Sequence, residues 1–192
     1  MKYTLIAIAA FAASVAGHGN VTSPAPRGTG PKMVETCGQA AVDAVDADPT
    51  IPLESVKPNN AACNLFLCRG ATFDDNKDKV QRFSANQVVD FKVGLPIPHE
   101  GPANVSIVNT ADNKAIGEPL ISFDSYADEK LAQLPPNNTA FSVTMPRLAE
   151  GQCTQPGACV LQWFWFGTGA KQTYESCVDF VMKEERAAAD GR

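Results

Sequence analysis

Apolar and polar residues alternate along much of this chain, which is the pattern of β-strands with one buried face. The clearest example is 88–95, in which every second residue from Val89 to Leu95 is apolar. Proline and glycine separate such segments, and helical patterns are scarce. Further strands are predicted at 103–108, 141–145, 160–166 and 177–182. The pattern predicts an all-β fold, an antiparallel β-sandwich of the immunoglobulin or fibronectin type with long loops and at most short helices, one of them at 39–45.

The first 17 residues have the pattern of a secretory signal peptide. A basic start and an apolar run at 5–13, too short to span a membrane, precede small residues at 14–17. We expect cleavage between Gly17 and His18, although cleavage after Ala16 fits the small-residue rule as well. The mature protein is therefore expected to be secreted and to begin at His18.

The remaining chain is long enough to form one domain. Residues 18–182 can bury a core without a partner, so a monomer is expected. Residues 183–192 form a charged, alanine-rich tail that is predicted to be disordered. Loss of Lys2 leaves 15 of the 16 basic residues against 21 acidic ones. This balance argues against nucleic acid or an anionic membrane as a partner and favours a neutral polymer or a small ligand.

Six cysteines in a chain marked for secretion predict three disulfides that staple the fold. The competing use of cysteine, a zinc site, is disfavoured because the chain has no Cys-x-x-Cys pair. The pairing suggested by short separations is Cys63 with Cys68, Cys153 with Cys159 and, by exclusion, Cys37 with Cys177.

Three Asn-x-Ser/Thr sequons begin at Asn20, Asn104 and Asn137. They are typical of a glycoprotein secreted by a eukaryote. A glycan on Asn20 would crowd a metal ion bound at His18.

The chain has only two histidines, His18 and His99. At the start of the mature chain, His18 offers its α-amine and its ring to a single metal ion. His99 lies in a loop between two predicted strands, where binding sites are often built, although a loop histidine without a ligand is the commoner case. Two imidazoles and an amine form a nitrogen-rich set that favours Cu(II), and an amine with a pKa of about 8 loses its proton to a metal at modest cost. Copper is therefore the expected cofactor.

Four elements of the chain, in this order, resemble the lytic polysaccharide monooxygenases, especially their chitin-binding type-4 branch. They are His18-Gly19 after a signal peptide, His99-x-Gly-x-Ala before a strand, the strand Leu161-Gln162-Trp163-x-Trp165, and Gln172-x-Tyr174-x-x-Cys177 followed by Asp179-Phe180. The resemblance covers most of the mature chain and implies a copper histidine brace. By the resemblance, His18 and His99 bind the metal, Tyr174 takes the axial position, and Gln172 orients an oxygen species.

These C-terminal residues also have plainer interpretations. Tyr174 is a common strand residue that can belong to the core, and Gln172 can simply begin a strand. Asp179 would match a carboxylate that related fungal copper proteins use as an additional ligand. Tyr174 and Asp179 point to opposite faces of a regular strand, so both reach one metal only if a bulge lies between them. Asp179 is therefore expected to be structural unless that bulge exists.

The aromatic strand 160–166 bears on the substrate. Trp163 and Trp165 share one face, while Phe164 and Phe166 share the other. Two apolar faces on one strand predict burial on both sides rather than a platform for stacking sugars.

Three functions follow from these features. The resemblance implies an enzyme that cleaves glycosidic linkages of a cell-wall polysaccharide by oxidation, with chitin, cellulose or hemicellulose as the substrate and an external electron donor. The first alternative is a secreted protein that binds copper through the same brace without catalysis, for copper uptake or at the cell wall. The second is a carbohydrate-binding module without a metal.

Overall fold

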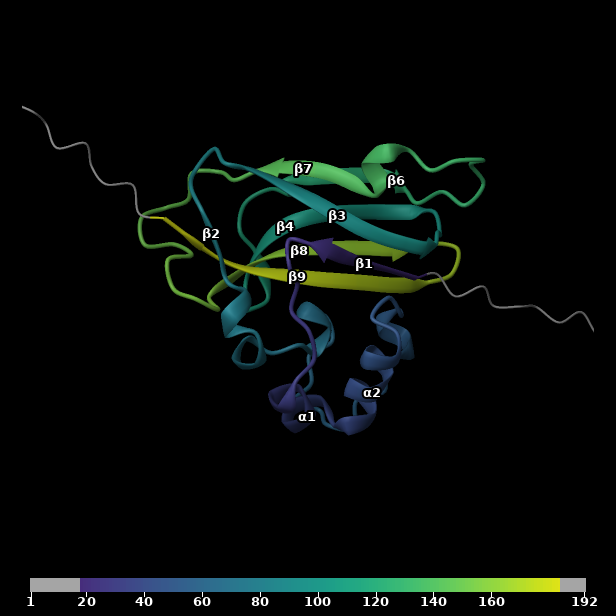
Figure 1. Ribbon diagram of the computed structural model, residues 1–192, viewed down its shortest axis with the longest axis horizontal. Helices are drawn as coiled ribbons and strands as arrows, with labels where there is room; N and C mark the ends of the chain where they lie inside the picture. Colours follow the sequence, from purple (N-terminus) through teal and green to yellow (C-terminus); the bar gives the residue numbers. More distant parts are fainter. Residues whose placement is uncertain (1–17, 184–192) are drawn as a thin grey trace, which may run out of the picture.

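Two β-sheets pack face to face in the computed structural model of the protein, which describes residues 18–183 (Figure 1). The smaller sheet has the strand order β1 (His18–Ser23), β3 (Val88–Ile97), β7 (Ala140–Thr144). The larger sheet has the order β2 (Gln81–Phe83), β9 (Gln172–Met182), β8 (Cys159–Gly167), β4 (Gly101–Asn109), β5 (Lys114–Ala115), with β6 (Ile121–Tyr126) also paired to β4. All pairs are antiparallel except the short β2 beside β9. The predicted antiparallel β-sandwich is confirmed.

All five predicted strands are present, and four further strands were missed. β9 begins at Gln172, five residues before its predicted start at 177. Its first half shows no alternation of apolar and polar residues because both faces are covered, and Glu175 and Ser176 are buried together with Tyr174. A strand that is buried on both sides loses the period-two signal.

The main core lies between the two sheets. Trp163 and Trp165 are fully buried there, and Tyr126 from the β6 edge meets both rings edge-on. Phe164 and Phe166, on the opposite face of β8, are half-buried. The prediction that the two tryptophans belong to the core is confirmed.

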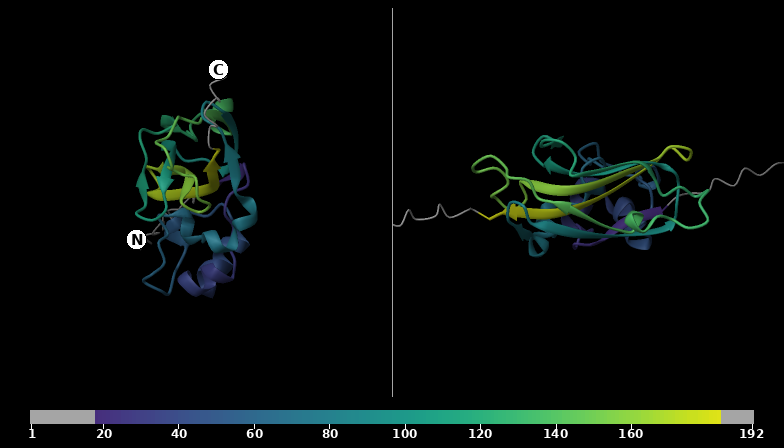
Figure 2. Two further views of the ribbon diagram at one scale, coloured as in Figure 1. Left: turned by 90° about the vertical axis from the view of Figure 1, so that its left-hand side faces the viewer. Right: turned by 90° about the horizontal axis from the view of Figure 1, so that it is seen from above.

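A helical layer covers the outer face of the larger sheet, on the side away from β7 (Figures 1 and 2). It is the connection from β1 to β2, and it packs around an apolar cluster of its own that includes Met33, Val42 and Val45. Proline at the first position of α1 begins that helix. Helix α2 confirms the helix predicted at 39–45 and extends it by two residues, whereas α1 was not predicted. The helices and turns are α1 (Pro31–Cys37), α2 (Gln39–Ala47), η1 (Leu53–Ser55), η2 (Cys68–Gly70), η3 (Phe73–Asp75) and η4 (Lys77–Lys79), with η5 (Pro136–Asn138) elsewhere, before β7.

The described residues form three disulfides, and the one between η2 and β9 joins the helical layer to the larger sheet. The observed pairs are Cys37–Cys63, Cys68–Cys177 and Cys153–Cys159.

The expected pairing was correct for Cys153 with Cys159 and wrong for the other four cysteines. Cys63 packs with the cluster around α1 and α2, while Cys68 packs with Val108 and Val160 against the sheet. Cys63 and Cys68 are therefore close in sequence but belong to different apolar clusters. A short separation along the chain does not show that their side chains point to different places.

Several expectations concern the ends of the chain. The signal peptide expected at 1–17 and the tail expected at 183–192 lie outside the described residues, except for Lys183. Its backbone N–H donates to the carbonyl of Phe83. Between residues 18 and 183, no helix is long and apolar enough to cross a membrane.

Candidate metal centre

His18 begins the first described strand, at the end of the sandwich where β3 leads into β4 (Figure 1). It lies opposite Ile97, two residues before His99, in the antiparallel pairing of β1 with β3. The next residue, Gly19, donates its backbone N–H to the carbonyl of Thr50 at 2.9 Å. The start of β1 is thus held between the smaller sheet and the segment that follows α2.

Trp165 connects the segments that carry the predicted metal ligands. A Cβ atom at Gly19 would lie 2.9 Å from the Trp165 ring, so glycine allows β1 to rest on the indole. The indole N–H donates to the carbonyl oxygen of His99 at 3.1 Å. The ring also stacks on Tyr174, with a centroid distance of 4.3 Å. The segments of His18, His99 and Tyr174 therefore meet at one buried tryptophan.

The imidazole of His18 contacts a carboxylate that sequence reasoning missed. Its Nε2 atom lies 3.1 Å from Oδ2 of Asp48, just after α2. Asp48 also accepts hydrogen bonds from the backbone N–H and the hydroxyl of Thr50. Burial opposes ionisation of this carboxyl group, but the Thr50 hydrogen bonds and the neighbouring His18 outweigh it and lower the pKa of Asp48. Asp48 is therefore a carboxylate fixed against the first histidine.

His99 is buried, with 8% of its surface exposed. A Cβ atom at Gly167 would lie 3.0 Å from the Cβ of His99, so β8 packs closely against this side chain. The neighbouring Glu100 donates its backbone N–H to the carboxylate of Glu129. The pKa of Glu129 is lowered by its own backbone N–H and by this bond from Glu100. His99 is therefore a buried side chain at the end of the sandwich.

Tyr174 and Gln172 are two residues apart on β9 and share a face of the strand. The Tyr174 hydroxyl donates to Oε1 of Gln172 at 2.8 Å. Burial raises the pKa of Tyr174 well above its usual value, and the charge of Glu54 adds to the effect, so the phenol stays neutral. Glu54 itself accepts the backbone N–H of Thr173. The structure thus joins Tyr174 and Gln172 in one hydrogen-bonded pair.

Asp179 points to the other side of the sheet. The pairing of β9 with β8 runs without a break from Gln172 to Phe180, so no bulge brings Asp179 toward Tyr174. Both carboxylate oxygens of Asp179 accept hydrogen bonds from Arg27 at 2.7 Å, and both side chains are buried. Asp179 is a structural partner of Arg27, in agreement with the two-residue period of a strand.

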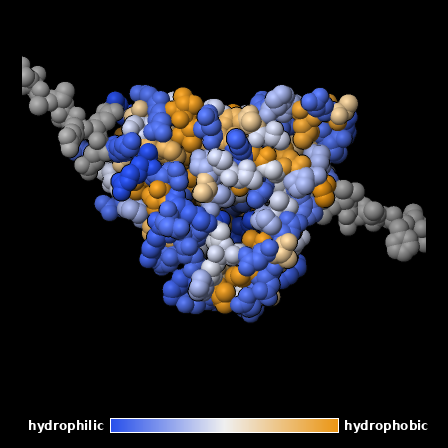
Figure 3. Space-filling model, in the orientation of Figure 1, coloured by the Kyte–Doolittle hydropathy of each residue, from blue (hydrophilic) through white to orange (hydrophobic). Residues whose placement is uncertain are grey.

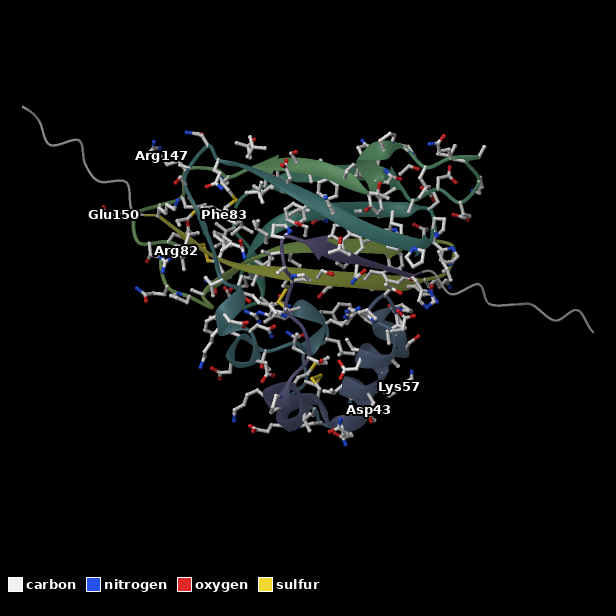
Figure 4. The ribbon with its side chains drawn as sticks, in the orientation of Figure 1. Asp43, Lys57, Arg82, Phe83, Arg147 and Glu150 are labelled. Carbon is white, nitrogen blue, oxygen red and sulfur yellow. A yellow bond between two sulfur atoms is a disulfide. The ribbon has the colours of Figure 1, made fainter. Side chains whose placement is uncertain are left out.

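The charged residues labelled at the far end of the sandwich are remote from this region. Arg82, Arg147 and Glu150 lie at the end opposite to the start of β1 (Figure 4). Within residues 18–183, no three side chains of histidine, cysteine, aspartate or glutamate gather to hold a metal ion. A metal bound at His18 and His99 would therefore require another kind of donor.

No family model matches the sequence, and no curated protein matches it either. Among solved structures, the chain is similar to an AA10 lytic polysaccharide monooxygenase from Streptomyces lividans, with 14% identity, a TM-score of 0.49, and coverage of 85% of this chain and 99% of that chain. It is similar to a chitin binding domain from Burkholderia pseudomallei, with 13% identity, a TM-score of 0.48, and coverage of 87% and 100%. A third is the copper complex of the cellulose active lytic polysaccharide monooxygenase CelS2, with 12% identity, a TM-score of 0.49, and coverage of 88% and 100%. At this identity the likeness concerns the fold alone.

Proposed function

We propose that the mature protein is secreted, begins at His18 and binds one copper ion through a histidine brace. The donors are the α-amine and Nδ1 of His18 and the imidazole of His99. Three disulfides support secretion, because disulfides persist in oxidising compartments. The α-amine supplies the donor that side chains alone do not provide, and the all-nitrogen set favours copper.

The contact between His18 and Asp48 carries this proposal. A histidine that binds a metal through one ring nitrogen usually donates the other N–H to a carboxylate, which fixes the tautomer and the ring orientation. In this structure Oδ2 of Asp48 lies 3.1 Å from Nε2 of His18, where it can accept that N–H. This leaves Nδ1, the ring nitrogen nearer the backbone, beside the α-amine of the same residue. Both atoms can then close one compact chelate ring.

The surrounding residues shape the other sides of this centre. Tyr174 is a neutral phenol stacked on Trp165, so this side is apolar and excludes water. Its hydroxyl holds the Gln172 amide in one orientation. Trp165 anchors the His99 backbone. The protein would thus hold the ligands in place and exclude water from one side of the site, which is the contribution expected of a protein around a redox metal.

The enzymatic function that fits this arrangement is oxidative cleavage of a cell-wall polysaccharide. Copper, when bound, would supply redox chemistry with O2 or H2O2, using an external electron donor. Tyr174 would keep its side of the site dry, and its bond to Gln172 would hold the amide in place beside the bound metal. Chitin, cellulose and hemicellulose are the candidate substrates.

The test begins with the full chain secreted from a eukaryotic host, by measuring the mass of its N-terminal peptide. A start at His18 is expected, and any other start would remove the chelating amine and overturn the brace. The copper-loaded protein is then incubated with reductant, peroxide and each polysaccharide. Oxidised oligosaccharides are expected from the wild type and not from His99→Ala. Polysaccharide binding that survives both His99→Ala and copper removal, without any oxidised product, would instead support a metal-free binding module.

A second candidate is a secreted copper-binding protein without catalysis. This candidate is supported by the lack of an exposed aromatic platform for stacking sugars. Within residues 18–183, the exposed large apolar side chains are Phe66, Val88 and Leu131, and only Phe66 is aromatic. Figure 3 shows apolar residues scattered among polar ones on the face it displays. Tight copper binding with no product from any polysaccharide would favour this candidate over the enzyme.

A further inference from the structure

A groove lined by both polar and apolar side chains lies on the outer face of the larger sheet, on the opposite side of β8 from Trp163 and Trp165. This groove has a volume of about 290 Å³. Its floor is formed by β4, β8 and β9, and Phe66 lies at its rim. The backbone carbonyl of Phe66 accepts a hydrogen bond from Asn113 in the turn after β4, which ties the rim to the sheet.

The floor of the groove is a row of three residues on neighbouring strands. Asn104 on β4 lies directly opposite Phe164 on β8, and Phe164 lies directly opposite Glu175 on β9. Neighbouring strands are about 4.8 Å apart, so the row measures roughly 10 Å from Asn104 to Glu175. Ser106 and Gln162 form the next row beside it. An aromatic ring flanked by amide, hydroxyl and carboxyl groups matches the alternating apolar faces and hydroxyl groups of a sugar.

Glu175 points to a ligand independently of this pattern. The side chain is almost fully buried, and Oε2 has no hydrogen-bond partner among the described residues. Burial raises the pKa of Glu175 to about 8, against the opposing effects of the backbone N–H groups and the charge of Arg69, so the group is protonated at neutral pH. Buried polar atoms in folded proteins normally have a partner. Glu175 therefore places an unsatisfied polar group in the wall of the groove, which favours a polar occupant.

The other end of the row is a glycosylation sequon. Asn104-Val105-Ser106 places both polar residues of the sequon in the groove and Val105 in the core. Ser106 donates its hydroxyl to Oδ1 of Asn104 at 3.1 Å. None of the hydrogen bonds described within 18–183 uses Nδ2 of Asn104, which is the atom that carries an N-linked glycan.

We propose that Asn104 carries an N-linked glycan whose first sugar lies in this groove, across Phe164 and beneath the rim formed by Phe66. The donor is a lipid diphosphate-linked oligosaccharide of the secretory pathway. A bond forms between Nδ2 and C1 of the first sugar, the bond from C1 to the diphosphate breaks, and the Nδ2 proton leaves with the lipid diphosphate. The inference shares secretion with the proposed function but does not require copper, so a failed copper test leaves it standing and an unmodified Asn104 leaves the copper site standing.

The experiment uses the full chain secreted from a glycosylating eukaryotic host, with glycopeptides identified by mass. Asn137 is the internal control, because it begins a sequon on the exposed turn η5. Both sites are treated with an endoglycosidase under native and denaturing conditions. Native release at Asn104 is expected to be at least about ten-fold slower than at Asn137, since the groove protects the first sugars, and the two rates should converge after unfolding.

Phe66→Ala distinguishes protection by the groove from a general effect of the fold. Phe66 is 56% exposed, so its removal leaves the core intact. This variant is expected to accelerate native release at Asn104 and to leave Asn137 unchanged. An unmodified Asn104, equal native release at both sites, or no response to Phe66→Ala would each overturn the proposal.

Discussion

Asp48 holds Nε2 of His18 at 3.1 Å, and it is itself held by two hydrogen bonds from Thr50. The carboxylate belongs to the helical layer, whereas the histidine begins the smaller sheet. The orientation of the first histidine therefore depends on how the helical layer docks on the sandwich. A substitution of Asp48 should therefore change metal binding while both histidines stay in place.

Asp48→Asn is expected to weaken Cu(II) binding by about 10- to 100-fold, the usual effect of removing a carboxylate behind a metal-bound histidine. The measurement is a competition titration with a copper chelator on protein verified to begin at His18. Asp43→Asn, on the exposed face of α2, is the matched control and should bind like the wild type. Equal affinity in both variants would show that Asp48 has no role in metal binding.

Gly19→Ala tests the packing of β1 on Trp165. The new Cβ would meet the indole at 2.9 Å and Leu95 at 3.0 Å, so the strand or the ring must move. Overpacking of this kind costs about 1–3 kcal/mol, measured as the free energy of unfolding in urea. Gly169→Ala is the control, because a Cβ there meets nothing within 4 Å. A stable Gly19→Ala variant with unchanged copper affinity would contradict the close contact.

Particular residues show what the sequence could and could not predict. Strand β3 was found because Val89, Phe91 and Val93 face the core while their neighbours face solvent. Asp48 was missed because an acidic residue after a helix and before proline has the pattern of an ordinary turn. Its contact with His18 depends on a long-range docking that no local pattern encodes. Local periodicity therefore predicted the longer strands and helix α2, but not α1 or the way in which the helical layer docks on the sandwich.

The disulfides allow the docking of the helical layer to be tested directly. Replacing Cys68 and Cys177 by alanine is expected to cost about 4–5 kcal/mol of unfolding free energy, because the bond closes a separation of 109 residues. Replacing Cys153 and Cys159, which are separated by 6 residues, should cost about 2 kcal/mol. Thermal and urea unfolding of the two double variants provide the comparison. A larger loss for the short loop would contradict the expected order.

The buried Glu175 predicts how stability depends on pH in the unglycosylated protein. Its pKa is raised from an ordinary value of 4.5 to about 8, mainly by burial. Between these two values the folded state retains a proton that the unfolded state has released. Stability contributed by this group is therefore complete below pH 4.5 and is lost as the pH rises toward 8, with a slope of at most about 1.4 kcal/mol per pH unit.

Glu175→Gln removes this titration while keeping the size of the side chain. The variant is expected to gain stability relative to the wild type as the pH rises from 5 to 8. Urea unfolding at several pH values measures the difference, and Glu118→Gln, in an exposed segment, should give a curve parallel to the wild type. A pH-independent difference between Glu175→Gln and the wild type would mean that Glu175 is already ionised in the folded protein. In that case the charge of Arg69 and the backbone N–H groups, rather than a proton, would balance the carboxylate.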